Sequence, residues 1–467
     1  MSSKISRWIG SALVVAWGVL FVAISSAEAQ IKYTQRGFIL MDYKVGGNIS
    51  KADRDFSKNE SIDFGTQRFR IWNNWKLGEF ANAEWMWEID AVLGASAPRL
   101  VTTTGGSTSN LGRDFTNPLR GDVVKIETGI ARLDVTIPTT DWHLRMGQQS
   151  FFTVLPQFQE RVPGIKIYKA GGWIKPTIFF IPEEKDLFRS VTRNQDNDDQ
   201  IVGAWVNISP MKGLKFQPYF LWNNRKNESL GSGTENDFQR ADFGFTSEYK
   251  AKGWYVNYLV VGQSGEQDFD DPTIKDRDIE SWAMEFGAGY DVGVNNFSFN
   301  FLYRRGQNAR NTGDITGWSP IVTFFANKNR MSQLLTSVNQ HPTHDLEIGG
   351  TTGPQNDSDA GWRVWGLWWK RPFNKQTRFE LGFSVIQSDK LMDNDKFGGG
   401  QTAGDDRHVG EAFDLLIVHK VTKGLTFNTG AAFLIPGDGL DQPNGSGGSS
   451  DADCCPFALF ASAILRF

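Results

Sequence analysis

The sequence predicts an all-β protein, a transmembrane antiparallel up-and-down β-barrel of 18 strands, and three observations predict it. Segments of alternating apolar and polar residues recur along residues 30–467. The connections between these segments alternate between short turns and long polar loops. A secretory leader precedes this region, and an alternating segment ending in phenylalanine closes the chain. A closed barrel suits a membrane because it leaves no unpaired strand edge in hydrocarbon.

Residues 1–29 have the three parts of a secretory signal peptide. Lys4 and Arg7 supply positive charge, an apolar stretch follows from about Trp8, and Ala27-Glu28-Ala29 fits the A-x-A cleavage pattern. We therefore expect the mature chain, 30–467, to form a single barrel with long extracellular loops. An uncleaved membrane anchor is the alternative, and the small residues of the cleavage motif argue against it.

The charge balance and the apolar runs exclude two classes of protein. Removing Lys4, Arg7 and Glu28 with the leader leaves 49 − 2 = 47 basic and 53 − 1 = 52 acidic residues, a net charge of −5. This excludes the basic footprint of a nucleic-acid-binding protein. No stretch after the leader has 18 consecutive apolar residues, so no membrane helix is predicted. The two cysteines, Cys454 and Cys455, are adjacent and provide no disulfide framework.

The segment 81–93 shows the alternation most clearly. Seven apolar side chains fall on one parity, whereas Glu84, Glu88 and Asp90 fall on the other. Successive side chains of a strand point to opposite faces, so one face suits lipid and the other suits water. Eighteen such segments begin near residues 33, 67, 81, 123, 142, 164, 173, 201, 214, 238, 254, 279, 296, 361, 377, 408, 425 and 456. The segments near 164 and 173 are the weakest, and a count of 16 follows if they belong to a loop.

The connections fall into two length classes. The short ones are 78–80, 138–141, 170–172, 210–213, 251–253, 291–295, 371–376 and 421–424, and the longest of the others is 306–360. Short periplasmic turns and long external loops are typical of outer-membrane barrels. Aromatic residues of the apolar parity lie beside the short turns, where a periplasmic girdle is expected: Trp75, Trp142, Tyr249, Trp254 and Tyr290.

Charged residues on the water-facing parity are the candidate lining of the lumen. A barrel of about 18 strands leaves an aqueous channel. The candidates carry both signs, and they are Arg68, Arg70, Glu84, Glu88, Asp90, Arg132, Arg145, Arg304 and Arg378, with Arg363 adding to the basic character. They either orient ionic solutes or form a cross-strand lattice that stabilises the wall. Both interpretations are open, and neither strong anion nor strong cation selectivity is expected.

The loop 150–163 after the fifth strand is the candidate constriction. Its position is similar to that of the constriction loop of bacterial porins. It combines apolar anchors, Phe152 and Phe158, with the charged pair Glu160 and Arg161, so we expect it to fold inward. A surface loop packed on the rim is the alternative.

The sequence predicts no catalytic site, no metal site and no cofactor. Nucleophilic catalysis needs a nucleophile and a base within hydrogen-bond reach. None of the five histidines has an evident serine partner. We therefore expect a channel rather than an enzyme, through which small hydrophilic or ionic solutes diffuse passively.

Three C-terminal motifs resemble the alginate-export family of outer-membrane porins: VGEAFD at 409–414, KGLTF at 423–427 and FLIPG at 433–437. The resemblance implies an 18-stranded barrel in the bacterial outer membrane, in contact with lipid and lipopolysaccharide. It also implies an alternative function, export of an anionic polysaccharide such as alginate. The final strand resembles the terminal strand that the barrel-assembly machinery recognises, because alternate residues from Phe457 to Phe467 are apolar.

Overall fold

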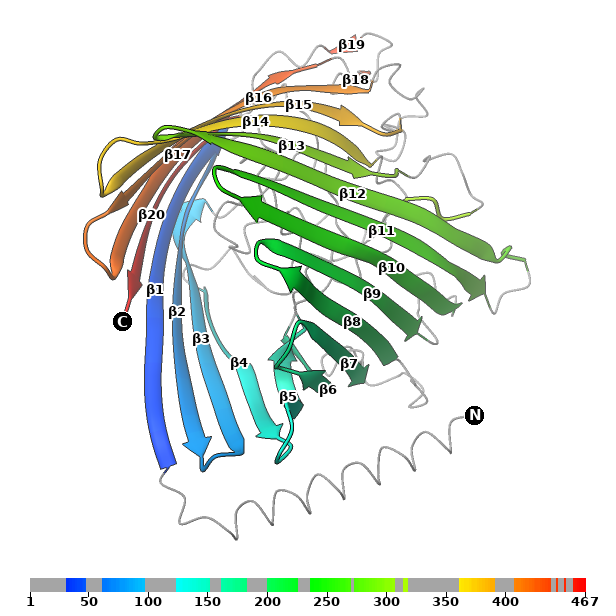
Figure 1. Ribbon diagram of the computed structural model, residues 1–467. Helices are drawn as coiled ribbons and strands as arrows, with labels where there is room; N and C mark the ends of the chain where they lie inside the picture. Colours follow the sequence, from blue (N-terminus) through cyan, green and yellow to red (C-terminus); the bar gives the residue numbers. More distant parts are fainter. Residues whose placement is uncertain are drawn as a thin grey trace.

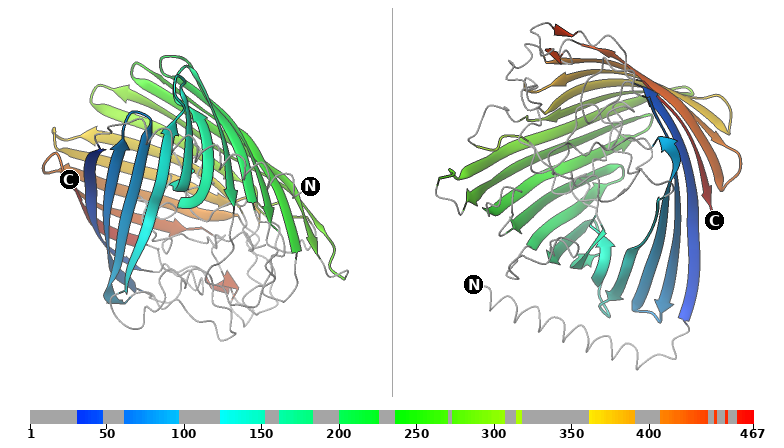
Figure 2. Two further views of the ribbon diagram at one scale, coloured as in Figure 1. Left: turned by 90° about the horizontal axis from the view of Figure 1, so that it is seen from below. Right: turned by 180° about the vertical axis from the view of Figure 1, so that it is seen from behind.

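The computed structural model describes residues 31–47, 61–96, 123–151, 161–182, 200–225, 236–269, 273–306, 314–317, 361–390, 407–437, 442–443, 449–450 and 457–467. The predicted leader lies outside these residues. Eighteen long strands follow one another around a wall (Figures 1 and 2). They are β1 (Ile31–Gly47), β2 (Ser61–Leu77), β3 (Ala81–Ser96), β4 (Val123–Thr136), β5 (Trp142–Ser150), β6 (Arg161–Lys169), β7 (Ile174–Pro182), β8 (Gln200–Met211), β9 (Leu214–Arg225), β10 (Asn236–Ala251), β11 (Trp254–Phe269), β12 (Arg277–Val292), β13 (Asn295–Arg304), β14 (Trp362–Pro372), β15 (Thr377–Ser388), β16 (His408–Lys420), β17 (Leu425–Pro436) and β20 (Phe457–Arg466). The short strands β18 (Gln442–Pro443) and β19 (Ser449–Ser450) pair only with each other.

The wall is a closed ring. Each long strand pairs antiparallel with its neighbour in the sequence, and β20 pairs with both β17 and β1. No edge of the ring is therefore left without a partner, which is what the bilayer interior requires of a sheet. The predicted 18-stranded antiparallel barrel is confirmed. Within the described residues, no helix is long and apolar enough to cross a membrane.

The two weakest predicted segments are strands of the ring. Strand β6 pairs with β5 over nine residues, and β7 pairs with β8 over nine, although β6 and β7 share only the ladder from Ile165 to Tyr168. Pro176 lies within β7, where a missing N–H weakens a strand prediction. The neighbouring strands supply the pairing that the local sequence does not suggest. The alternative count of 16 strands is wrong.

The two parities of each strand meet different surroundings. On β3, Trp85 and Trp87 are 43% and 48% exposed, whereas Glu84 and Glu88 are 6% and 2% exposed. One parity of a closed barrel faces outward and the other faces the enclosed space. The apolar parity therefore faces the surroundings and the charged parity faces the inside, as the sequence predicts.

The last residue of the chain seals the ring at the seam between β1 and β20. The Gly37 amide donates to the Phe467 carbonyl at 2.9 Å, and the Phe467 amide donates back to the Gly37 carbonyl at 3.0 Å. The Phe467 ring lies over Gly37, where an added Cβ would be 2.5 Å from a ring carbon. It also stacks on Phe69 of β2, with ring centroids 6.3 Å apart. Glycine at position 37 makes room for the terminal aromatic ring.

Candidate functional site: the charged inner wall

The inner faces of β2 and β3 carry the first charged cluster. Glu88 lies between two arginines, because the strand register places Arg70 opposite Glu88 and Arg68 two residues away on the same face. Arg68 Nη2 lies 3.1 Å from one carboxylate oxygen of Glu88, and Arg70 Nε donates to the other. Asp90 is paired with Arg68 along the backbone ladder, but its side chain lies outside what the structure describes. One buried carboxylate thus serves two guanidinium groups.

The next ion pair joins β3 to β4. The ladder pairs Glu84 with Arg132, and Arg132 Nη2 lies 2.5 Å from Glu84 Oε2. The Glu84 side chain is 7% exposed, and the Arg132 side chain is 19% exposed. Sequence parity placed both residues on the inside, and the register brings them together.

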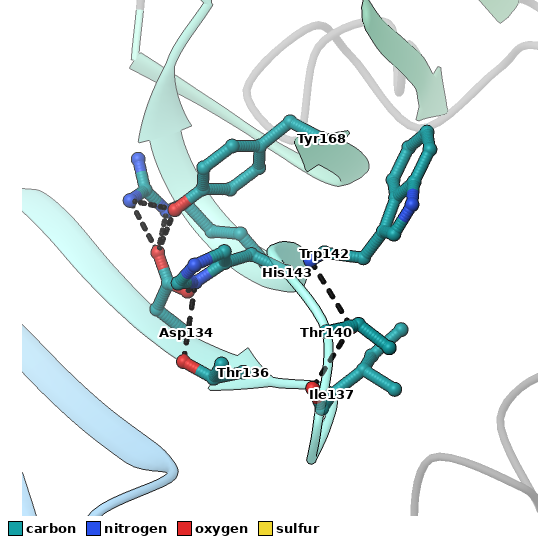
Figure 3. A network of polar contacts seen from close by, with 8 residues as sticks. Asp134, Thr136, Ile137, Thr140, Trp142, His143 and Tyr168 are labelled. Atoms are coloured by element: carbon teal, nitrogen blue, oxygen red, sulfur yellow. Dashed lines mark hydrogen bonds and ion pairs between the residues drawn. The ribbon is translucent and has the colours of Figure 1, made fainter. Parts of the chain in front are cut away.

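A denser network links β4, β5 and β6 around Asp134 (Figure 3). One oxygen of Asp134 accepts from Arg145 Nε at 2.5 Å and from the Tyr168 hydroxyl at 2.6 Å. The other oxygen lies 3.1 Å from His143 Nδ1. The imidazole of His143 stacks on the Tyr168 ring, with centroids 4.9 Å apart. Sequence reasoning selected Arg145 in this network but neither Asp134 nor Tyr168.

The tight turn between β4 and β5 sets the register of this network. The Thr140 hydroxyl donates to the Ile137 carbonyl at 2.9 Å and accepts from the Trp142 amide at 3.2 Å. Both contacts are visible to the right of the network in Figure 3. The strand pairing that follows places Thr136 opposite His143, with Oγ1 and Nδ1 3.3 Å apart. The turn therefore fixes which side chain of β5 reaches Asp134.

Lys166 of β6 is a cation of the inner wall that the sequence analysis missed. Its side chain faces inward, and the residue is 8% exposed. Its Nζ lies 5.5 Å from the ring centroid of Phe151 and 5.7 Å from that of Tyr168. Within the described residues no carboxylate lies at ion-pair distance from this ammonium. The parity shared with Tyr168 could have identified Lys166, but the strand prediction was weakest here.

The inner wall carries cations and carboxylates side by side. Its cations are Arg68, Arg70, Arg132, Arg145 and Lys166, and its described carboxylates are Glu84, Glu88 and Asp134, with Asp42 of β1 buried on the inner face beside β2. All four arginines form ion pairs with carboxylates. Their contacts therefore agree with the interpretation in which these residues form a cross-strand lattice that stabilises the wall. Orientation of ionic solutes by these residues stays a prediction.

The remaining predicted arginines lie far around the ring. Arg378 on β15 forms an ion pair with Glu380, Nε to Oε1 at 2.7 Å. Arg304 ends β13 on the inner face and is 8% exposed. Arg363 does not belong with them, because it shares the outward parity of Tyr303, its ladder partner. Its guanidinium lies 5.7 Å from the Tyr303 ring centroid.

Asp389, just beyond the end of β15, holds the two ends of the longest loop together. Its Oδ2 accepts from the Gly306 amide at 3.0 Å, and its own amide donates to the Gly361 carbonyl at 3.2 Å. Arg363 Nη2 donates to Oδ1 at 2.6 Å. Burial alone would raise the pKa of the Asp389 carboxyl, but the bonds from Gly306 and Arg363 outweigh it and lower the pKa below its ordinary value.

The start of the predicted constriction loop lies against the inner wall. Phe151 is fully buried and packs on Phe179 of β7, with ring centroids 5.3 Å apart. The same apolar cluster includes Trp205 of β8 and Leu221 of β9. Phe152, Phe158 and Glu160 lie outside the described residues, and Arg161 opens β6 with its side chain undescribed. The inward course of this loop therefore stays a prediction, which the position of Phe151 favours.

The sequence of the chain matches no protein-family model and no curated protein. Solved structures nevertheless share its architecture. OccAB4 of Acinetobacter baumannii is similar with a TM-score of 0.52 at 11% identity, over 94% of this chain and 99% of that one. OccK8 (OprE) of Pseudomonas aeruginosa has a TM-score of 0.52 at 11% identity, over 93% and 98% of the two chains. The outer membrane protein OpdK of Pseudomonas aeruginosa has a TM-score of 0.50 at 10% identity, over 93% and 99%. At these identities the likeness establishes the fold.

Proposed function

We propose that this protein is a porin of the bacterial outer membrane through which small hydrophilic or ionic solutes diffuse passively. The observation that carries the proposal is the closed ring of 18 antiparallel strands with its apolar parity outside and its charged parity inside. A ring of this size is too wide for wall side chains to fill, so it encloses water. The fold shared with the outer membrane protein OpdK supports the location.

The wall chemistry supports a channel of weak ion selectivity. The four arginines of β2 to β5 form ion pairs with Glu84, Glu88 and Asp134, whereas Lys166 of β6 has no carboxylate at ion-pair distance in the described part of the wall. Rings of one sign give strong selectivity, and mixed rings do not. We infer a modest preference for anions.

An export channel for a polyanion such as alginate is the less favoured function. Such a conduit calls for a continuous basic surface, whereas carboxylates alternate with the arginines on this wall. Membership of the alginate-export family stays a prediction from three short motifs, since no family model matches the chain.

Delivery to the membrane forms part of the proposal. Residues 1–29 direct secretion and are removed. The terminal strand β20 then presents Phe467 to the barrel-assembly machinery before it closes the seam with β1. Lipid and lipopolysaccharide surround the finished barrel.

Single-channel recording in planar bilayers tests the function. The purified barrel should conduct in potassium chloride, and a salt gradient should give a small reversal potential of the sign that an anion preference produces. A folded sample, identified by its heat-modifiable migration in gels, that never conducts would contradict the proposal.

A further inference from the structure

The outer face of the wall has an apolar hollow of about 940 Å³ over β11 to β17. A row of outward side chains crosses the five strands β11 to β15. Each residue of the row is paired in the sheet with the next one: Trp254, Tyr290, Phe297, Trp369 and Leu381. All five line the hollow. The row lies next to the short turns, at the end of the barrel where the interfacial girdle is expected.

A second row of ladder partners runs beside the first, farther from the short turns. It continues from β12 to β17 through Ala288, Phe299, Leu367, Phe383, Phe413 and Phe433. Leu367 is 56% exposed and Phe413 is 44% exposed, so these side chains have no protein covering them in the described part of the chain. Ala288 is small between larger neighbours. The hollow thus extends from the girdle toward the middle of the wall.

Basic side chains border the hollow on the side of the short turns. Lys252 lies in the turn that leads into Trp254. Arg371 follows Trp369 by two residues on the same outward parity, and Lys375 lies in the next turn. All three are exposed, and none has a carboxylate at ion-pair distance among the described side chains. An apolar hollow with unpaired cations at its mouth is complementary to an anionic lipid, in which apolar chains lie below a negative headgroup.

We propose that this hollow binds an anionic diacyl phospholipid of the leaflet on the short-turn side. The acyl chains lie against the two rows, and the phosphate lies beside Arg371 and Lys375. Lys252 lies three strands away at the other side of the mouth, about 14 Å by the spacing of strands, and attracts the headgroup at longer range. The inference rests on the proposed location of the barrel in a bilayer. Because the three cations lie at the short-turn end of the hollow, the lipid belongs to the leaflet on that side of the barrel. The volume falls within the range of roughly 300–1,000 Å³ that is typical of ligand sites.

Native mass spectrometry of the detergent-purified protein tests the proposal, with dioleoyl phosphatidylglycerol, dioleoyl phosphatidylcholine and lipid A as probes. Phosphatidylglycerol should bind more tightly than phosphatidylcholine. The triple variant Lys252→Gln, Arg371→Gln, Lys375→Gln should lose this advantage, by about five-fold for each charge removed. Ala288→Trp should weaken both phospholipids because it fills the hollow.

The matched control removes three cations from the same end of the barrel away from the hollow: Lys32→Gln, Lys76→Gln and Lys212→Gln. It should leave phosphatidylglycerol binding unchanged. Equal binding of the two phospholipids, equal losses in both triple variants, or tighter binding of lipid A would overturn the proposal. The proposal would also be overturned if the measured mass were that of a dimer and Ala288→Trp converted the dimer to a monomer, because a second copy of the chain would then occupy this face.

Conductance separates this proposal from the porin function. A barrel that conducts but binds the two phospholipids equally overturns only the lipid site. A barrel that binds phosphatidylglycerol through the three cations but never conducts overturns only the porin function. Heat-modifiable migration of each variant confirms that it has folded.

Discussion

Single side chains on the inner wall set its charge, and the partners of each one decide how much of that charge a solute meets. Arg70 and Arg145 are held by Glu88 and Asp134, respectively, so their charge is largely neutralised at close range. Lys166 lies opposite Arg145 in the strand ladder and packs on the rings of Phe151 and Tyr168, with no carboxylate at ion-pair distance in the described part of the wall. It is therefore the cation of this wall on which the anion preference should depend most.

Lys166→Gln should lower the permeability of chloride relative to potassium. A unit charge about 7 Å from an ion in water changes its energy by about 0.6 kcal/mol, or about three-fold in permeability. Glu88→Gln should shift the ratio in the opposite direction, because it frees the charge of two arginines. Reversal potentials in a potassium chloride gradient measure both. Lys212→Gln, in the short turn between β8 and β9, is the control, and an equal effect there would contradict the assignment.

The carboxyl of Asp389 should make stability depend on pH. Its pKa is lowered in the folded barrel, so its contribution is present above the ordinary value of 3.8 and is lost as the pH falls through the lower, folded value. Asp389→Ala leaves the buried Gly306 amide without its acceptor and should cost about 1–3 kcal/mol. The melting temperatures of wild type and variant should differ at pH 7 and converge in acid. A constant difference down to pH 2 would argue against this role.

The strands depend on their neighbours as well as on their own sequences. Strands β6 and β7 have nine residues each, about the minimum that a crossing strand needs. Their pairing with β5 and β8 completes the ring although their own alternation is weak. At the seam, β20 pairs with β1 over ten residues, and Gly37 leaves the space that the Phe467 ring fills at the end of this ladder.

Gly37→Leu should impair closure of the barrel. The new side chain would occupy the position of the Phe467 ring, and both hydrogen bonds between residues 37 and 467 would be strained. The expected result is a lower yield of the heat-modifiable folded form and a lower melting temperature. Ala461→Leu, at an exposed outward position of the same seam, should fold normally. Normal folding of both variants would show that the close approach at Gly37 is unnecessary.

The whole molecule is a ring of strands with lipid outside and water inside, and this explains why the outward parity of the strands is apolar throughout. Ile178 in the middle of β7 is 58% exposed on the outside, and Val292 at the end of β12 is 51% exposed beside a short turn. The two side chains are similarly exposed but lie at different distances from the turns. Their depths in the bilayer should therefore differ.

Ile178→Arg should destabilise the barrel far more than Val292→Arg. A lipid-facing arginine costs about 2–4 kcal/mol at the midplane and about 0–1 kcal/mol near an interface. Denaturant unfolding in lipid vesicles measures both differences. Equal costs would show that β7 does not cross the bilayer at the depth that the ring implies.

The alternation of residues by itself determined much of this protein: the barrel class, most of the strands, the positions of the short turns and the inward face of the charged residues on β2 to β5. These properties follow from the period of two along a strand, which is local. Only the tertiary structure decided which charges meet. Arg70 meets Glu88, and Asp134 contacts Arg145, Tyr168 and His143, through the register between strands. The apolar hollow likewise needs seven neighbouring strands, since register and curvature are properties of the closed ring.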